Sequence, residues 1–217
     1  MLYKQNQSYE LDEKLFKNPT SEYRAAPFWA WNCKLNKDIL NEQIDIFKKM
    51  GFGGFHMHSR IGMSTPYLKD EFMGLIKFCT QKAEQENMLA YLYDEDRWPS
   101  GSAGGYVTKT HKYRQRYLIF SQNSREHFSL DEAINSSKDY LLAVFDVVLN
   151  EKGELKSYHT ISENDTAIGT KWYAYVHTHD ESPWHNNQTY VDTLNKEAID
   201  EFIKITYEAY QSAVGDK

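Results

Sequence analysis

The sequence predicts an α/β protein in which buried parallel strands alternate with helices and are followed by antiparallel strands. Three observations predict this class. Short, almost continuously apolar segments recur before residue 100, amphipathic helical patterns separate them, and the apolar period changes after about residue 106. Apolar strands joined by helices are typical of parallel sheets covered on both faces. Two architectures fit this pattern, a doubly wound sheet or a (β/α)₈ barrel.

The first predicted strand is a short aromatic run at residues 28–32, and the polar residues 1–26 form a lead-in segment. Asn36 is a good N-cap for the helix that follows it. Apolar residues at helical spacing continue from there to Met50, and Gly51 is a typical stop residue.

Two further strands are predicted at residues 52–58 and 88–93, with a helix at about 68–86 between them. The helix is indicated by an apolar stripe at a period of three to four residues. The third strand ends directly in three acidic residues, Asp94, Glu95 and Asp96.

The middle of the chain has a strand-like period and no long helical pattern. Its predicted strands are residues 115–122, 140–149, 154–160 and 170–178, with a hairpin turn at 150–153. A last helix is predicted at about 196–214, capped by Thr193 or Asn195. The predicted division of the chain is residues 1–26 as lead-in, 27–105 as βαβαβ units, 106–180 as an inserted β-rich subdomain, and 181–217 as a return loop and helix.

Composition excludes several classes of partner. The formal net charge is −6 and no block of Lys or Arg is present, which argues against nucleic acid. No run of about 18 apolar residues occurs, which argues against a membrane span. The N-terminus has no apolar leader, so we expect a cytoplasmic protein. Cys33 and Cys79 are far apart without metal-ligand spacing, so we expect free thiols.

In both architectures ligands bind at the carboxyl ends of the strands. Aromatic, imidazole, carboxylate and guanidinium side chains gather at those ends, which suits the hydroxyls and apolar ring faces of a sugar. The predicted substrate-binding residues there are Trp31, Asn32, His56, His58, Arg60, Asp96, Arg97 and Trp98. Glycoside hydrolysis needs two carboxyl groups, and Glu95 and Asp94 are the predicted catalytic pair.

Each of these features also has an ordinary structural interpretation. The three acids could form a solvated loop, and His56 and His58 could be structural or could bind a metal together with an acid. The glycine-rich residues 99–105 lack the known nucleotide-binding patterns. A second polar and aromatic cluster at residues 183–192, which includes Tyr190 and Asp192, could be a helix-entry loop or a pocket wall.

Four runs together resemble the N-terminal catalytic region of glycoside hydrolases of the α-L-rhamnosidase type (family 106). The most specific is the run from Leu92 to Gly101, and the others are residues 27–32, 59–68 and 190–195. The likeness covers residues 25–105 and 182–213. It implies a partial TIM (β/α) barrel with an inserted antiparallel β subdomain after the third strand.

The resemblance also implies an activity and a set of site residues. Relatives act on terminal deoxy-sugars, such as α-L-rhamnosides, by an inverting reaction, and some use calcium in the sugar site. By this analogy Glu95 and its neighbours, with His56, His58 and Asp192, line the sugar subsite. No other cofactor or metal is expected.

A full barrel needs about 250 residues, and only three βα units are predicted here. We therefore expect a truncated N-terminal portion of such an enzyme, inactive alone, that self-associates or requires a missing C-terminal half of the barrel. The alternatives are a non-catalytic carbohydrate-binding module and a metal-dependent hydrolase of another class that uses His56, His58 and an acid.

Overall fold

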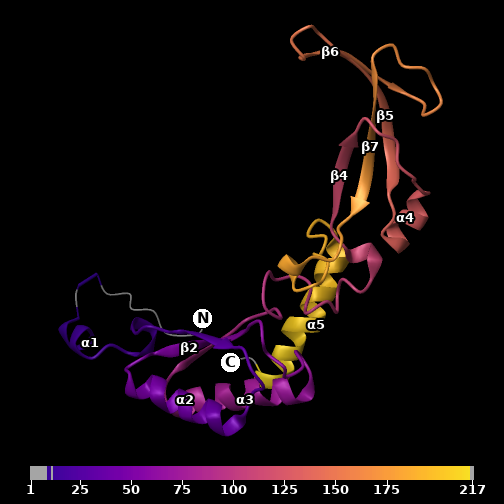
Figure 1. The fold of residues 1–217 in the computed structure, drawn as a ribbon. Coiled ribbons are helices and arrows are strands. Elements are labelled where there is room, and N and C mark those ends of the chain that lie inside the picture. The colour runs from indigo at the N-terminus through magenta and orange to yellow at the C-terminus, as the bar shows by residue number, and fades with distance from the viewer. Residues whose placement is uncertain (1–8, 11, 216–217) are drawn as a thin grey trace. The chain divides into compact units, whose positions relative to one another are not determined.

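The computed structural model describes residues 9–10 and 12–215, and it divides into two compact units (Figure 1). The first unit consists of the described residues up to Gly104 together with those from Glu201 onward. The second unit is Gly105–Asp200. None of the described helices is long and apolar enough to cross a membrane.

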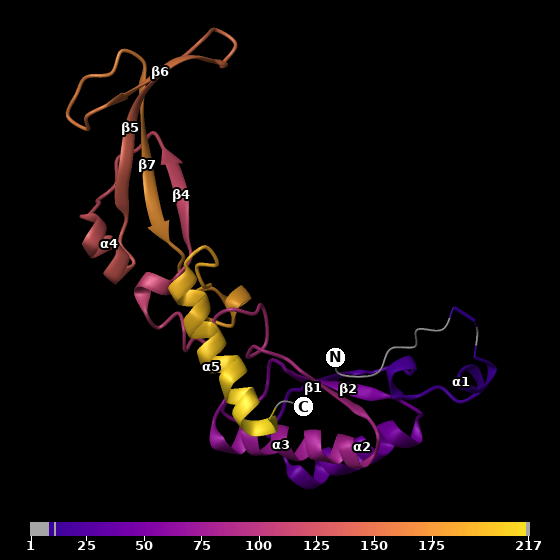
Figure 2. The same cartoon turned by 180° about the vertical axis from the view of Figure 1, so that it is seen from behind.

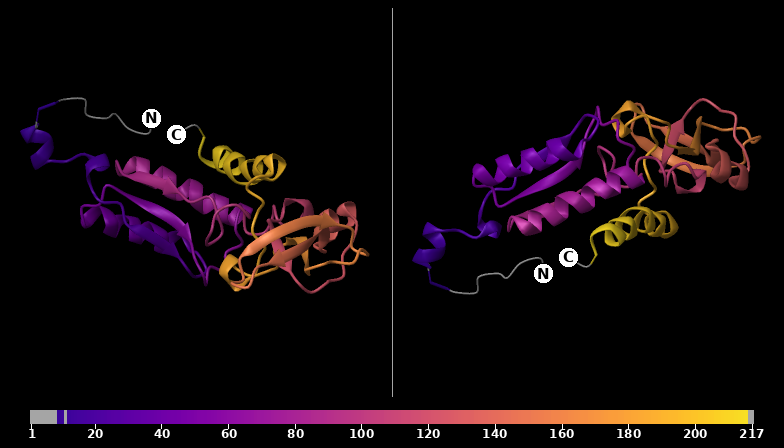
Figure 3. Two further views of the ribbon diagram at one scale, coloured as in Figure 1. Left: turned by 90° about the horizontal axis from the view of Figure 1, so that it is seen from above. Right: turned by 90° about the horizontal axis from the view of Figure 1, so that it is seen from below.

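The first unit contains a parallel sheet of three strands in the order β1-β2-β3. Helices α2 and α3 cover one face of this sheet (Figures 1 and 3). The strands are β1 (Phe28–Trp31), β2 (Gly54–Ser59) and β3 (Leu89–Leu92), and the helices are α1 (Glu13–Lys17), η1 (Ser21–Tyr23), α2 (Lys37–Lys49), α3 (Asp70–Gln85) and α5 (Lys196–Val214), of which the last belongs to this unit from Glu201 onward.

Local sequence explains where these elements begin. The Asn36 side chain accepts hydrogen bonds from the backbone N–H groups of Asp38 and Ile39, which confirms it as the N-cap of α2. Leu40 and Ile44 are the buried residues of that helix. The three predicted strands and the two helices between them are therefore confirmed as elements, within one or two residues at their ends.

The core of the first unit lies between the sheet and its two helices. Side chains alternate along a strand, so Trp29 and Trp31 lie on the same face. Their rings meet edge to face with centroids 5.6 Å apart. Trp29 also contacts Phe55 at 5.1 Å, and Trp31 contacts Phe72 of α3 at 5.7 Å. These aromatic contacts hold α3 on β1 and β2.

Gly53 marks the point where the N-terminal segment crosses the start of β2. The Gly53 N–H donates to the Ala25 carbonyl at 2.9 Å. A Cβ atom at this position would lie 1.9 Å from the Ser21 carbonyl oxygen, a contact that requires the backbone to move. Only glycine therefore lets residues 21–25 pack on β2.

We expect Gly53→Ala to lower the free energy of unfolding by about 1–3 kcal/mol, because the new methyl group overpacks this crossing. Gly74→Ala is the matched control. A Cβ atom at Gly74 would meet nothing within 4 Å, and the residue lies inside α3. Its replacement should raise the free energy of unfolding by about 0.5–1 kcal/mol. Urea unfolding followed by circular dichroism measures both, and equal effects of the two changes would contradict the packing described here.

The second unit contains an antiparallel sheet of four strands in the order β4-β7-β5-β6 (Figure 2). Its core consists of Val144, Tyr173 and Tyr175, against which Ile119 and Leu141 pack. The strands are β4 (Arg116–Ser121), β5 (Tyr140–Leu149), β6 (Leu155–Ile161) and β7 (Thr170–Thr178). Along the chain, helix η2 (His111–Tyr113) precedes β4, α4 (Leu130–Ser136) lies between β4 and β5, and η3 (Pro183–His185) follows β7. All four predicted strands are confirmed as elements. The sequence prediction missed α4, which Ser129 and Glu132 cap reciprocally.

A buried carboxylate organises one loop of this unit. Asp146 is 4% exposed, and its two oxygens accept hydrogen bonds from the Ile168 N–H at 2.9 Å and the Gly169 N–H at 2.8 Å. The side chain thereby fixes the end of the loop that connects β6 to β7.

The predicted partial TIM barrel with an inserted antiparallel subdomain is wrong as a fold class. The described strands form two separate sheets of opposite type, a parallel one of three strands and an antiparallel one of four, and neither closes on itself. A barrel of this type needs eight tilted parallel strands to return to the first. The chain is instead mixed α/β with two open sheets. The predicted four-part division of the chain stays a prediction.

Candidate functional site

The carboxyl ends of β1, β2 and β3 lie along one edge of the parallel sheet, because the strands are parallel and in register. The loops that leave β1 and β2 run side by side there. The Arg60 N–H donates to the Trp31 carbonyl at 2.9 Å. Gly62, at φ +100°, passes so close to Asn32 that a Cβ atom would lie 2.6 Å from its carbonyl oxygen. The edge thus brings Asn32 and Arg60 into neighbouring loops.

Trp31 is the last residue of β1, but its ring is not exposed at this edge. It is 2% exposed and packs in the helix-covered core against Trp29 and Phe72. We therefore do not include Trp31 in the candidate site. Asn32, the next residue, is exposed.

The face of the sheet opposite the helices carries two stacked ring pairs. His56 stacks on Tyr91 with centroids 4.4 Å apart, and His58 stacks on Tyr93 at 3.6 Å. Phe28 contacts His58 at 4.4 Å. The two histidines thus lie on one face, as their spacing of two residues along a strand predicts.

His58 is held as a neutral imidazole. Burial lowers the pKa of His58, and the nearby charges of Arg60 and His56 act in the same direction, whereas the hydrogen bond to the Ser59 carbonyl opposes them. The Nδ1 atom lies 2.7 Å from the Ser59 carbonyl oxygen. A carbonyl only accepts, so Nδ1 carries the proton and Nε2 carries a lone pair. His58 can therefore accept a hydrogen bond from a hydroxyl group.

Glu95, the middle acid after β3, is buried and fully engaged by the backbone. It is 2% exposed. Its Oε1 accepts from the N–H groups of Asp96, at 2.8 Å, and Gly104. Its Oε2 accepts from Gly101 at 2.9 Å and Ala103 at 2.7 Å. Burial raises the pKa of Glu95 to about 7, and the four N–H donors, which favour the charged form, oppose this rise.

Asp94 and Asp96 flank Glu95 and are partly exposed. Asp94 accepts from the Ser100 hydroxyl at 2.6 Å and from the Tyr207 hydroxyl of α5 at 2.8 Å. Burial raises the pKa of Asp96, and the Arg97 guanidinium, whose Nε lies 3.7 Å from Oδ1, opposes the rise. These two carboxyl groups, in contrast to Glu95, are not enclosed by backbone donors.

Trp98 and helix α5 complete the surroundings of the acidic residues. The Trp98 side chain is 51% exposed. From α5, the Tyr210 hydroxyl donates to the Tyr93 carbonyl at 2.8 Å, one turn after Tyr207. The sequence prediction missed both tyrosines as site residues. The only available signal was their spacing of three residues on a helix, which does not indicate what they contact.

Tyr190 and Asp192, the remaining predicted site residues, belong to the second unit. Tyr190 stacks on His185 with centroids 5.2 Å apart. Asp192 lies 3.6 Å from the Arg116 guanidinium. Their contacts in the second unit are those of a loop that leads into a helix, and a role in substrate binding stays a prediction.

The described residues do not fit a metal centre. Within residues 9–10 and 12–215, no group of three or more His, Cys, Asp or Glu side chains is arranged to hold a metal ion. Glu95, the most enclosed acid, has both oxygens engaged by N–H donors, which a cation would have to displace. These side chains therefore do not fit calcium.

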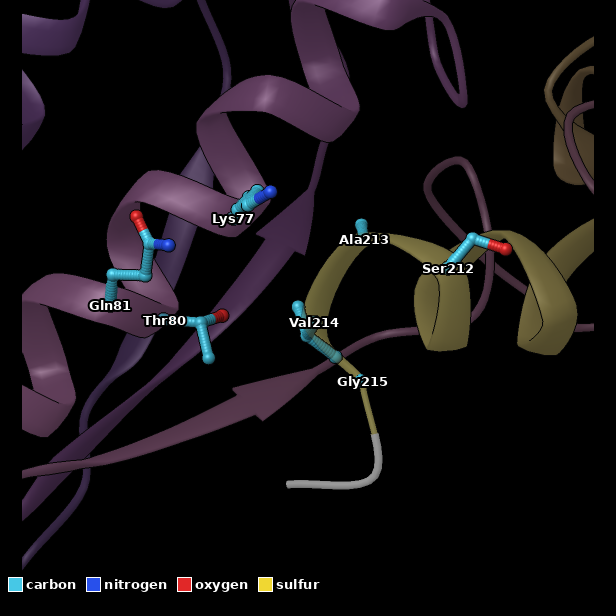
Figure 4. A pocket seen from close by; sticks show the side chains of 7 residues that line it. All are labelled: Lys77, Thr80, Gln81, Ser212, Ala213, Val214 and Gly215. Atoms are coloured by element: carbon cyan, nitrogen blue, oxygen red, sulfur yellow. The ribbon is translucent and has the colours of Figure 1, made fainter.

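A cavity of about 300 Å³ lies in another part of the first unit, between α3 and the end of α5 (Figure 4). It is lined by Lys77, Thr80, Gln81, Ser212, Ala213, Val214 and Gly215. None of these residues carries a carboxylate, an imidazole or an aromatic ring. The cavity therefore lacks the side chains on which the candidate site depends.

Comparison with known proteins gives a distant structural likeness. No protein-family model matches the sequence, and no curated protein matches it. Among solved structures, the chain is similar to a rhamnosidase from Novosphingobium sp. PP1Y, with 17% sequence identity and a TM-score of 0.45. The match covers 67% of this chain and 17% of that chain, so it spans only a small part of the rhamnosidase.

Proposed function

We propose that the first unit binds carbohydrate at the carboxyl edge of its parallel sheet, as the sugar-binding part of a protein related to glycoside hydrolases. The observation that carries the proposal is the grouping of side chains at the carboxyl ends of β2 and β3. His58 offers a neutral imidazole, and Asp94 and Asp96 offer carboxyl groups that hydroxyl and guanidinium partners hold in place.

The chemistry of these groups suits vicinal hydroxyls. The Asp94 oxygens each accept one hydroxyl hydrogen bond within the protein, and each keeps a lone pair for a second donor. The half-exposed Trp98 ring can cover the apolar face of a sugar, and Asn32 and Arg60 supply donors. The sugar class that the sequence resemblance implies, a terminal deoxy-sugar such as an α-L-rhamnoside, presents such an apolar face.

Hydrolysis would use two carboxyl groups in different protonation states. Asp96, whose pKa is raised by burial, suits the acid. Asp94, which accepts two hydroxyl hydrogen bonds, suits the carboxylate. Glu95 as a catalytic residue stays an untested prediction, and its enclosure by four N–H donors favours Asp96 in its place.

We expect Asp94→Asn to weaken the binding of L-rhamnose and of nitrophenyl α-L-rhamnoside about 10-fold or more, because hydrogen bonds to charged groups contribute about 1.5–3 kcal/mol. Asp96→Asn replaces the carboxyl group proposed as the acid, so it should weaken binding about 2- to 10-fold, because neutral hydrogen bonds contribute about 0.5–1.5 kcal/mol. Isothermal titration calorimetry measures the dissociation constants. Asp45→Asn is the control, because Asp45 pairs with Lys82 on the helical layer. Sugar affinity that is unchanged in both site variants, or absent in the wild-type chain, would refute the proposal.

The titrations with nitrophenyl α-L-rhamnoside also distinguish a hydrolase from a protein that only binds sugar. Release of nitrophenol would assign hydrolysis to the chain, whereas binding without release would favour a non-catalytic carbohydrate-binding unit. The metal-dependent hydrolase alternative is not proposed, because His56 and His58 stack on Tyr91 and Tyr93 and share no third ligand among the described residues. Self-association stays a prediction that sedimentation of the purified chain would test.

A further inference from the structure

We propose that Glu95 is a positioning residue, whose carboxylate holds residues 96–104 in the conformation that presents Asp96 and Trp98 to the sugar. We call this segment the Glu95 loop. The proposal rests on the proposed function for its effect on sugar binding. The anchoring of the loop is an independent claim about the structure.

The four donors to Glu95 come from both ends of the Glu95 loop. The Asp96 N–H lies at its start, and the Gly101, Ala103 and Gly104 N–H groups lie at its end. One side chain therefore ties the two ends together. Because Glu95 is 2% exposed, water does not replace the carboxylate as a partner for these donors.

The backbone of the Glu95 loop adopts conformations that an unanchored chain avoids. Arg97 has φ +80° and Ala103 has φ +51°, although neither residue is glycine. Left-handed backbone costs free energy at residues with a Cβ atom and persists only where surrounding contacts impose it. The Ala103 N–H is itself one of the four donors to Glu95. Loss of the acceptor would therefore release this residue toward its preferred conformations.

The residues that bind sugar in the proposed function depend on this loop. Asp96 and Trp98 lie inside it, and Ser100, which donates to Asp94, lies there too. A change in the path of the loop would displace all three without altering any of them chemically. This gives Glu95 an effect on affinity although neither of its oxygens is available to a ligand.

Glu95→Gln is the sharpest variant. It keeps the size of the side chain, but the amide nitrogen donates and does not accept, so two of the four N–H groups would face another donor. Glu95→Asp keeps the charge and the four acceptor sites on a shorter side chain, and it should restore part of the effect.

Asp146→Asn is the matched control in the second unit. Asp146 is 4% exposed and also accepts hydrogen bonds from two backbone N–H groups, those of Ile168 and Gly169. The Asp146→Asn substitution removes the same kind of interaction, between a buried carboxylate and backbone N–H groups, from a loop that carries no proposed sugar ligand. A loss of affinity caused by general destabilisation would affect both variants.

The experiment measures two quantities on the full chain, at a temperature where circular dichroism shows every variant folded. Amide hydrogen exchange of Gly101, Ala103 and Gly104 reports the anchor, and calorimetric titration with L-rhamnose and nitrophenyl α-L-rhamnoside reports binding. For Glu95→Gln we expect exchange of the three amides to be at least about 10-fold faster and the affinity for sugar to be about 10-fold weaker. Glu95→Asp should recover part of the amide protection and part of the sugar affinity. Asp146→Asn should change neither the exchange of these three amides nor the sugar affinity.

Unchanged exchange in Glu95→Gln would overturn the anchoring, and faster exchange with unchanged affinity would overturn the positioning role. A wild-type chain that binds no sugar would refute the proposed function, while the exchange rates alone would still decide the anchoring. If Glu95→Gln does not fold, amide exchange in the wild-type chain tests the anchoring instead. Anchored amides should exchange at least about 100-fold more slowly than those of an unstructured peptide, and no protection would overturn the proposal.

Discussion

Trp31→Ala is expected to lower the free energy of unfolding of the first unit by about 3–5 kcal/mol, the cost of removing a large aromatic side chain from a core. The ring is 2% exposed and packs edge to face on Trp29 and Phe72, so the smaller side chain would leave a cavity between β1 and α3. Urea unfolding gives the free energy. Amide exchange in β1, β2 and β3 assigns the loss to this unit.

Trp98→Ala is the control, because the same side chain is 51% exposed there. We expect it to change the free energy of unfolding by no more than about 1 kcal/mol and to weaken sugar binding. A larger loss of unfolding free energy for Trp98→Ala than for Trp31→Ala would contradict the structure. If Trp31→Ala keeps its stability and loses only sugar affinity, Trp31 belongs to the site, as its position at the end of a strand first indicated.

The contrast between the two tryptophans illustrates what the sequence could predict. The strand around Trp31 was evident from its aromatic run, but its position at the strand end suggested a ligand contact. Strand alternation places Trp31 on the same face as Trp29. Which face the helices cover decides the role of both rings. That choice depends on α2 and α3, not on the strand itself.

Glu95 marks a limit of another kind. Three consecutive acids after an apolar strand predict that at least one is used, but not which one. The distinction depends on where the N–H groups of Gly101, Ala103 and Gly104 point, and hence on the conformation of a glycine-rich loop. Such a loop has few local preferences that a sequence pattern could reveal. Tyr207 is a harder case, because it meets Asp94 from more than 100 residues away.

The error in fold class has a similar origin. Apolar strands separated by amphipathic helices predict parallel pairing, and β1, β2 and β3 do pair in parallel. The same local pattern occurs in open sheets and in closed barrels. Closure depends on the number and tilt of the strands, which are global properties. The local pattern therefore could not distinguish the architectures, and the choice of a barrel depended on the resemblance.

Tyr175→Ala is expected to lower the free energy of unfolding of the second unit by about 3–5 kcal/mol. Tyr175 is fully buried in the small core with Val144 and Tyr173, and its hydroxyl accepts from the Arg125 N–H at 2.9 Å. Amides of β4, β5 and β7 should therefore lose protection from exchange. Because the chain divides into two compact units, those of β1, β2 and β3 should keep theirs.

Tyr175→Phe separates the two contributions of this side chain. It keeps the ring in the core and removes only the acceptor of the Arg125 N–H, so we expect the free energy of unfolding to fall by about 1 kcal/mol. Equal losses in the two variants would mean that the hydrogen bond, not the ring, stabilises the unit. Loss of protection in all the strands of both sheets would show instead that the two units unfold together, because a local defect in one cooperative unit destabilises every amide that exchanges through its global unfolding.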